Sequence, residues 1–186
     1  MTPTTGDQGD PAVEPDTKDW TWVLERPCPE CSYDAGEVRR SDVPVRLRAN
    51  AGAWTQVLSQ PAVRRRPSPA VWSPLEYACH VRDVHRVFVG RVRAMLESDD
   101  PLFEDWDQDR QAVLGDYRGQ DPASVAAELV ASAADVADVY GSVEGPQWSR
   151  PGRRSNGSAF IVETIARYHL HDVEHHLVDV AGRRPT

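Results

Sequence analysis

Apolar residues recur every three or four positions along four long stretches of the chain, a spacing that gathers them on one side of an α-helix. The stretches run from about 43 to 58, 73 to 96, 121 to 141 and 159 to 180. The second and third have strong start signals, because Ser73 and Asp121 suit the N-cap position and a proline follows each of them. No stretch shows the sustained alternation of a β-strand. The pattern predicts an all-α fold, a four-helix bundle.

The other segments lack this periodicity. Residues 1–19 are polar and acidic and are predicted to form a disordered tail, which leaves 20–182 as a single helical bundle domain. The acidic stretch 103–117 favours a short helix, and 144–158 favours a loop.

The composition limits where in the cell the protein is expected and which classes of partner it can bind. The 186 residues, 40% of them hydrophobic, are sufficient for one buried core. No apolar run is long enough to span a membrane, and the first residues lack the apolar part of a secretion signal. Together with only three cysteines, Cys28, Cys31 and Cys79, this predicts a cytoplasmic protein with reduced thiols. The net charge of −8 argues against nucleic-acid binding, which needs a basic face.

Histidines fall in two places, and this clustering is the main chemical signal. Two lie in the second predicted helix and four in the last: His80 and His85, then His169, His171, His175 and His176. At about 100° per residue, Asp172 and His176 flank the apolar stripe of the last helix and share one face. His171 and His175 lie roughly 160° from the centre of that stripe and are predicted to face water. In the second helix His80 borders the apolar stripe, whereas His85 lies further out.

Two neighbouring helices of a bundle can bring His80, Asp172 and His176 together, and bundle interiors commonly hold metals through carboxylates and imidazoles. Three protein ligands leave one position open for water or a substrate thiolate, as in catalytic metal sites. Two alternatives stay open. The ligand pair of the last helix could be His171 and His175, which are also four residues apart, or the histidines are hydrogen-bonded packing residues.

Two motifs at these positions resemble the DinB/YfiT-like superfamily. In Trp72-SPLEYAC-His80 a tryptophan stands eight residues before the position of the family's first metal histidine. Asp172-VEH-His176 resembles the family's ligand pair, in which Glu or His stands four residues before His. The Asp-Val pair at 179 and 180 is similar to the isomerase branch. The resemblance spans roughly 43–180.

This resemblance implies a four-helix bundle with zinc or nickel bound by His80, Asp172 and His176. The superfamily includes mycothiol-dependent maleylpyruvate isomerases and bacillithiol S-transferases, so the resemblance also implies a low-molecular-weight thiol as co-substrate and a small electrophile as its partner. A homodimer is expected by analogy with other bundles.

Three functional hypotheses remain. The first is an enzyme, a metal-dependent thiol S-transferase or a thiol-dependent isomerase that acts on a small electrophile. The second is a non-catalytic bundle, a stress-response or sensor protein that the metal stabilises. The third is a redox module built on Cys28 and Cys31.

Cys28 and Cys31 form a CxxC motif. A structural zinc site needs four ligands, and the sequence has no second CxxC. A redox pair would be expected in a βαβ context, which is not predicted. We therefore interpret both residues as thiols without chemistry, with a role in a lid over the bundle mouth as an alternative.

Polar residues near the last helix offer further chemistry. Arg153 and Arg154 precede it and are predicted to bind a carboxylate or phosphate of the substrate, unless they belong to a solvated loop. Asp179 is placed to orient His176, and the alternative is an acidic surface residue in the last turn of the helix.

Overall fold

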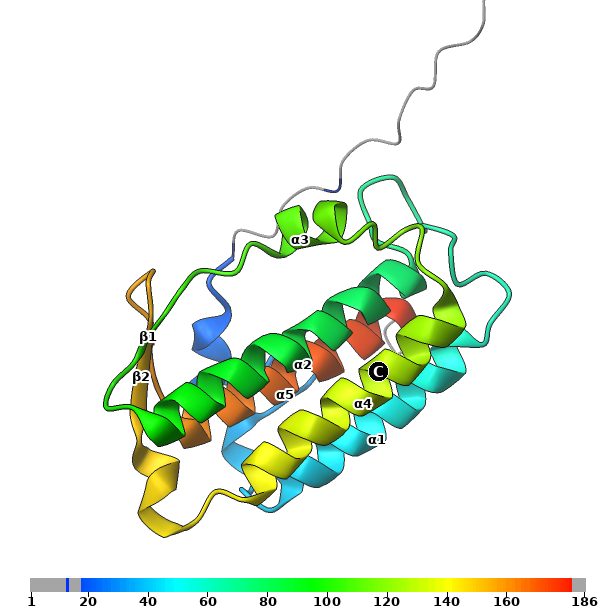
Figure 1. Cartoon of the computed structure of the whole chain (residues 1–186). Coiled ribbons are helices and arrows are strands. Elements are labelled where there is room, and N and C mark those ends of the chain that lie inside the picture. Colours follow the sequence, from blue (N-terminus) through cyan, green and yellow to red (C-terminus); the bar gives the residue numbers. More distant parts are fainter. Residues whose placement is uncertain (1–12, 14–17, 182–186) are drawn as a thin grey trace, which may run out of the picture.

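The protein folds as a helical bundle whose helices are joined by irregular segments (Figure 1). This computed structural model describes residue 13 and residues 18–181. The bundle helices are α1 (Asp42–Leu58), α2 (Pro74–Glu97), α4 (Pro122–Gly141) and α5 (Val162–Ala181), and α3 (Gln108–Leu114) is a short additional helix. Three 3-10 helices complete the helical elements among the described residues: η1 (Trp20–Leu24), η2 (Ala35–Glu37) and η3 (Gly145–Ser149). Most of the predicted tail, and residue 182, lie outside the described residues.

The four long helices form a ring in which α4 packs against α1 and α2, and α5 packs against the same two helices from the other side. Helices α2 and α4 run in the same direction, so the segment between them returns along the length of the bundle and carries α3 with it (Figure 1). This long return is what parallel neighbours in a bundle require. The predicted all-α four-helix bundle is confirmed.

Local sequence signals explain where two of the helices begin. Ser73 caps α2 in a capping box, in which its hydroxyl accepts from the Glu76 backbone and the Glu76 carboxylate accepts from the Ser73 backbone at 2.8 Å. Asp121 caps α4 by accepting from the backbone N–H of Ser124 at 2.9 Å. Both starts agree with the predicted ones.

A small sheet closes one end of the bundle, so the prediction that the chain has no strands is wrong. It contains β1 (Leu102–Phe103), β2 (Pro151–Arg154) and β3 (Ala159–Ile161), with β1 parallel and β3 antiparallel to β2. Helix α5 therefore begins three residues later than predicted. The strands have two to four residues, too few to show alternation, and a turn that contains Gly157 at φ +94° joins β2 to β3.

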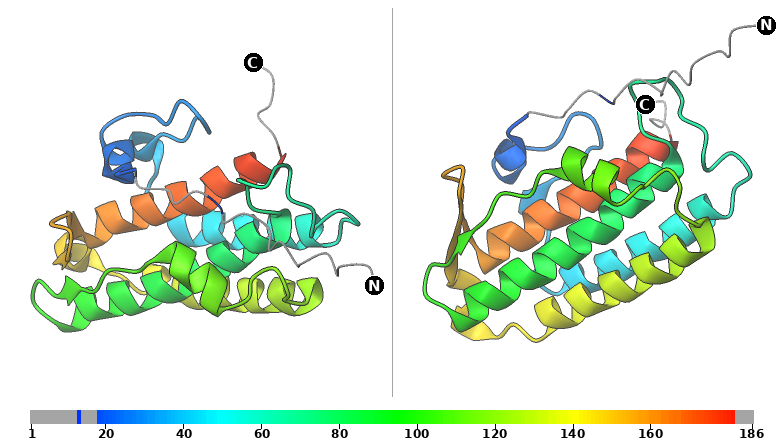
Figure 2. Two further views of the ribbon diagram at one scale, coloured as in Figure 1. Left: turned by 90° about the horizontal axis from the view of Figure 1, so that it is seen from above. Right: turned by 45° about the horizontal axis from the view of Figure 1, so that its top comes forward.

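The N-terminal segment, defined here as residues 18–38, packs along the outer side of α5 (Figure 2). Its 3-10 helices contact α5, and Val23, Cys28 and Tyr33 are buried there. The segment adds a second layer outside the ring of helices, so that α5 is covered on two sides.

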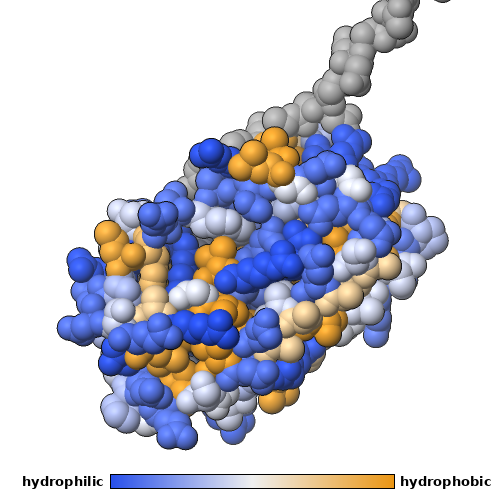
Figure 3. All heavy atoms as spheres, in the orientation of Figure 1, coloured by the Kyte–Doolittle hydropathy of each residue, from blue (hydrophilic) through white to orange (hydrophobic). Residues whose placement is uncertain are grey.

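The exterior is mixed in character. The face shown in Figure 3 is mainly hydrophilic, and its apolar residues form separate small patches, as is normal for a folded domain. Among the described helices, none combines the length and the apolar content that crossing a bilayer requires.

The contact between β2 and the bundle is tight at Gly152, and it predicts the effect of a small substitution. A Cβ at this position would stand 2.7 Å from Phe103 Cζ and 2.8 Å from Met95 Cγ, and both side chains are buried. We expect Gly152→Ala to lower the free energy of unfolding by about 1–3 kcal/mol. Urea unfolding followed by circular dichroism measures the change.

Gly52→Ala is the matched control, because a Cβ at Gly52 in α1 meets no atom within 4 Å. It should raise the stability by about 0.5–1 kcal/mol through helix propensity. Equal stabilities for wild type and Gly152→Ala would show that β2 is free to move away from the bundle.

Candidate metal centre

His80, Asp172 and His176 come together between α2 and α5. His80 lies in the second turn of α2, and the other two lie one turn apart near the end of α5. His80 Nε2 is 3.5 Å from Asp172 Oδ1, and His176 Nε2 is 3.7 Å from the same oxygen. Each residue offers one ligand atom, and these atoms all lie within 4.8 Å of one another. The structure thus assembles the three residues that the sequence analysis singled out, and their binding of a metal stays a prediction.

The fit of this group to a metal can be tested on its unpaired atoms. His80 Nε2 and Asp172 Oδ1 are buried, and neither makes a hydrogen bond within the described structure. Leaving such groups unpaired is unfavourable. Ligand atoms around a tetrahedral ion with bonds of about 2.0–2.2 Å stand roughly 3.3–3.6 Å apart, close to the 3.5 and 3.7 Å observed here. The donor set, two imidazoles and a carboxylate, fits a divalent ion.

The protonation states of these residues also favour binding of a cation. Burial lowers the pKa of His80, and Asp172 opposes this only in part. Burial would raise the pKa of Asp172, but the facing rings of His80 and His176 outweigh it and hold that pKa well below its usual range. At neutral pH the group therefore presents neutral His80 and ionised Asp172, the forms that bind metals.

The neighbours of the group fix its orientation. His176 Nδ1 lies 2.9 Å from Asp179 Oδ2, so Nδ1 carries the proton and donates it to Asp179 while Nε2 faces Asp172. The His80 ring is stacked on Trp106 and tilted against Trp72, with centroids 5.5 and 5.4 Å away. These contacts leave each ring little freedom to turn.

The group opens into a pocket of about 600 Å³, a size suited to a small organic ligand. Trp72, Trp106 and Arg154 line it, as do both acidic residues of the site, Asp172 and Asp179.

The two predicted substrate-binding arginines differ in position. Arg154 lines the pocket, and its Nε is buried without a hydrogen bond among the described residues. Arg153 is half exposed and forms an ion pair with Asp100 at 2.8 Å. Of the pair, only Arg154 lines the pocket, where its Nη2 lies 3.8 Å from Asp105 Oδ1.

A second cluster was missed by the sequence analysis. Cys28, Cys31, His171 and His175 each offer a ligand atom within 4.8 Å of the others. The prediction that His171 and His175 face water is wrong, since they are 3% and 7% exposed. The rings of Trp20 and Tyr33 cover them, so the N-terminal segment buries the helix face that the periodicity assigned to solvent. The available signal was the CxxC together with a His-x3-His, a zinc-site spacing.

Cys31 of the CxxC is not an activated thiol. Burial raises the pKa of Cys31 to about 12, whereas a reactive thiolate needs a depressed pKa. The redox interpretation is therefore disfavoured.

His85 and His169 form a separate buried pair. Both are 0% exposed, which corrects the prediction that His85 lies further out, and His85 Nδ1 is 3.0 Å from His169 Nε2. Helices α4 and α5 pack against two sides of α2. The apolar stripe of α2 alone therefore underestimates how much of that helix is buried. The two rings pair through these nitrogens, whereas His85 Nε2 is buried without a hydrogen bond among the described residues. Neither ring belongs to a candidate cluster.

Comparison with known proteins places the chain in a family. The model of the DinB superfamily matches residues 45–179, a range that includes His80, Asp172 and His176. Among solved structures, YfiT from Bacillus subtilis, described as a probable metal-dependent hydrolase with an unusual four-helix bundle topology, superposes with a TM-score of 0.71. The match covers 76% of this chain and 83% of that one at 14% identity, so it concerns the fold. No protein of curated function matches the sequence.

The buried His85 predicts how stability depends on acidity. Burial lowers its pKa from 6.5 to about 4, so the unfolded chain binds this proton first as the pH falls. The stabilisation is complete above pH 6.5 and is lost between there and pH 4. His85→Asn keeps an amide donor toward His169 but cannot titrate. Between pH 7 and pH 4, the free energy of unfolding should fall by about 3 kcal/mol less in this variant than in wild type.

Urea unfolding at pH 7 and pH 4, with a chelator in every sample, measures the difference. The chelator excludes protonation of metal-bound residues as a cause. Parallel stability curves for wild type and His85→Asn would contradict a neutral buried His85.

Proposed function

The chain belongs to the DinB superfamily, and from this premise we propose that it is a metal-dependent enzyme in which a low-molecular-weight thiol attacks a small electrophile. The reaction is an S-transfer or a thiol-dependent isomerisation. His80, Asp172 and His176 hold the divalent ion, zinc or nickel. In this proposal the protein acts in the cytoplasm, where small thiols stay reduced.

One observation carries the proposal, namely the facing, buried ligand atoms of His80 and Asp172 at the edge of a pocket, which stand 3.5 Å apart and make no hydrogen bond among the described residues. Three protein ligands leave a coordination position for a substrate atom, as in catalytic rather than structural sites. An ion held by these residues would lower the pKa of a thiol or water that it coordinates. A site serving only to stabilise the fold would have no need of the adjoining pocket.

The surrounding residues have separate parts in this proposal. Asp179 accepts from His176 Nδ1 and keeps Nε2 directed at the ion. Trp72 and Trp106 pack on His80 and exclude water from that side. Arg154 binds an anionic group of the thiol or the electrophile, since its guanidinium lines the pocket and retains an unpaired Nε.

A second candidate, metal-dependent hydrolysis, has support from YfiT, which is described as a probable metal-dependent hydrolase. It would use the same three ligands with water in place of the thiol. A metal-stabilised sensor without turnover is the non-catalytic alternative.

Metal content tests the centre directly. We expect His80→Ala and His176→Ala each to lose one equivalent of divalent metal per chain relative to wild type, because two ligands bind such an ion far more weakly than three. Elemental analysis of the folded proteins gives the counts. His85→Asn is the matched control, since His85 is a buried histidine of the same helix that is in no ligand cluster.

Activity then separates the candidate reactions. Wild type loaded with zinc or nickel should accelerate conjugation of a cysteine-containing thiol with monochlorobimane, and His80→Ala should reduce the rate to that of the uncatalysed reaction. Hydrolysis of an activated ester without thiol would favour the hydrolase instead. Bound metal without either activity would favour the non-catalytic sensor. A wild type that binds no metal at this centre would overturn the proposal.

The hydrogen bond from His176 to Asp179 predicts a graded effect. Asp179→Ala should weaken metal binding at the His80 centre by roughly 10–100-fold without abolishing it, because the ligand loses its orienting partner rather than its nitrogen. Competition with a chromophoric chelator measures the affinity. An unchanged affinity would mean that packing alone orients His176.

A further inference from the structure

We propose a second metal site, in which Cys28, Cys31, His171 and His175 bind a structural Zn²⁺ that fastens the N-terminal segment to α5. The cysteines come from the segment and the histidines from successive turns of the helix. The site shares no ligand with the His80 centre.

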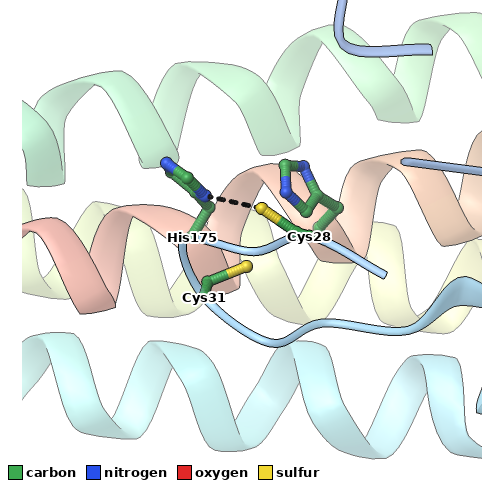
Figure 4. A group of neighbouring side chains, drawn as sticks. Cys28, Cys31 and His175 are labelled. Carbon is green, nitrogen blue, oxygen red and sulfur yellow. Dashed lines mark hydrogen bonds between the residues drawn. The ribbon is translucent and has the colours of Figure 1, made fainter. Parts of the chain in front are cut away.

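Geometry and donor chemistry agree on zinc. The four ligand atoms lie within 4.8 Å of one another, and Cys28 Sγ stands 3.8 Å from His175 Nδ1. Ligand atoms around a tetrahedral zinc with bonds of about 2.0–2.3 Å stand roughly 3.3–3.8 Å apart, so shifts of about an ångström complete the site. Figure 4 shows the two thiols beside the His175 ring. Two sulfurs and two nitrogens in a tetrahedron select zinc over harder cations.

His171 supplies an independent sign of a missing partner. The residue is 3% exposed, and its Nε2 is buried without a hydrogen bond among the described residues. Tyr33 and Trp20 pack against its ring and offer no partner to that nitrogen. A metal ion bound through this nitrogen would satisfy its lone pair and remove the unfavourable burial.

His175 is already turned as a ligand. Its Nδ1 faces the Cys28 thiol, whereas its Nε2 lies 3.6 Å from Asp179 and 3.8 Å from Glu30. Metal-bound histidines commonly direct the other ring nitrogen at a carboxylate, which fixes the tautomer. His175 therefore has a ligand side and an orienting side.

The loop that carries the cysteines holds its shape through backbone contacts. The Cys28 N–H donates to the Tyr33 carbonyl and the Ser32 N–H donates to the Cys28 carbonyl, both at 2.8 Å. Ser32, with φ +61°, turns the chain directly after Cys31. These contacts keep both thiols in place without a bond between them, and both are free.

The position of the site indicates its purpose. Trp20 and Glu30 of the N-terminal segment line the same pocket as the His80 centre, together with His171 and His175. A zinc ion that ties the segment to α5 therefore secures one wall of that pocket. Asp179 connects the two sites, because one of its oxygens faces His175 and the other His176.

Cobalt substitution of the full-length chain tests the proposal. Metal-free protein, reduced with a phosphine rather than a thiol, is titrated with Co²⁺. We expect a near-ultraviolet charge-transfer band from thiolate to cobalt, with the visible spectrum of tetrahedral Co²⁺. The His80 centre has no sulfur and cannot produce that band. Zn²⁺ should displace the cobalt and raise the Tm of the metal-free chain by on the order of 10 °C.

Variants separate the two sites. Cys28→Ser with Cys31→Ser should abolish the band and remove one zinc equivalent, whereas Cys79→Ala, at a buried cysteine outside the cluster, should do neither. His80→Ala should keep the band and lose only the other equivalent. If the His80 centre binds no metal, the wild type should still hold one zinc equivalent and give the cobalt band. The two proposals can therefore fail separately.

Two outcomes would overturn the second site. One is a folded, reduced wild type that gives no thiolate band with cobalt, a result that needs no variant. The other is wild type purified without reductant whose mass is lower by two hydrogens and in which only one thiol, that of Cys79, reacts after unfolding, since Cys28 and Cys31 would then form a disulfide.

Discussion

The structure depends on how the buried polar atoms of α5, and of α2 that faces it, find partners. An imidazole nitrogen or carboxylate oxygen that is removed from water needs a partner, and leaving it without one is unfavourable. His85 Nδ1 lies 3.0 Å from His169 Nε2, while His85 Nε2 is buried without a hydrogen bond among the described residues. His80, His171 and Asp172 each keep a buried atom with no hydrogen bond in the described structure. Both proposed ions stand where they would satisfy these atoms, so the same requirement links the stability of the bundle to its chemistry.

The N-terminal segment makes this possible on the outer side of α5. By packing Trp20 and Tyr33 over the helix, it turns a solvent-facing surface into an interior and brings Cys28 to His175. The segment is also one wall of the pocket. Asp179 lies at the boundary, with one oxygen toward each of two neighbouring histidines. Burial, metal binding and pocket shape are therefore interdependent in the two proposals.

Helical periodicity anticipated the bundle and the side of α5 on which Asp172 and His176 lie. Such arithmetic works because the angle between residues in a helix is fixed by its backbone. It failed for His171 and His175, since the angle tells which face a residue occupies and not what covers that face. It failed for β3 as well, because Ala159–Ile161 is held by pairing with β2 rather than by any pattern of its own.

The sequence alone determined the features that rest on neighbouring residues: the four long helices, the caps at Ser73 and Asp121, and the spacing of Asp172 and His176 on one face. Only the tertiary structure placed Cys28 beside His175, 147 residues away along the chain. Contacts between distant segments depend on how whole surfaces pack, and a single helix carries no record of which segment covers it. For the same reason, the sequence analysis did not connect the CxxC with the His-x3-His.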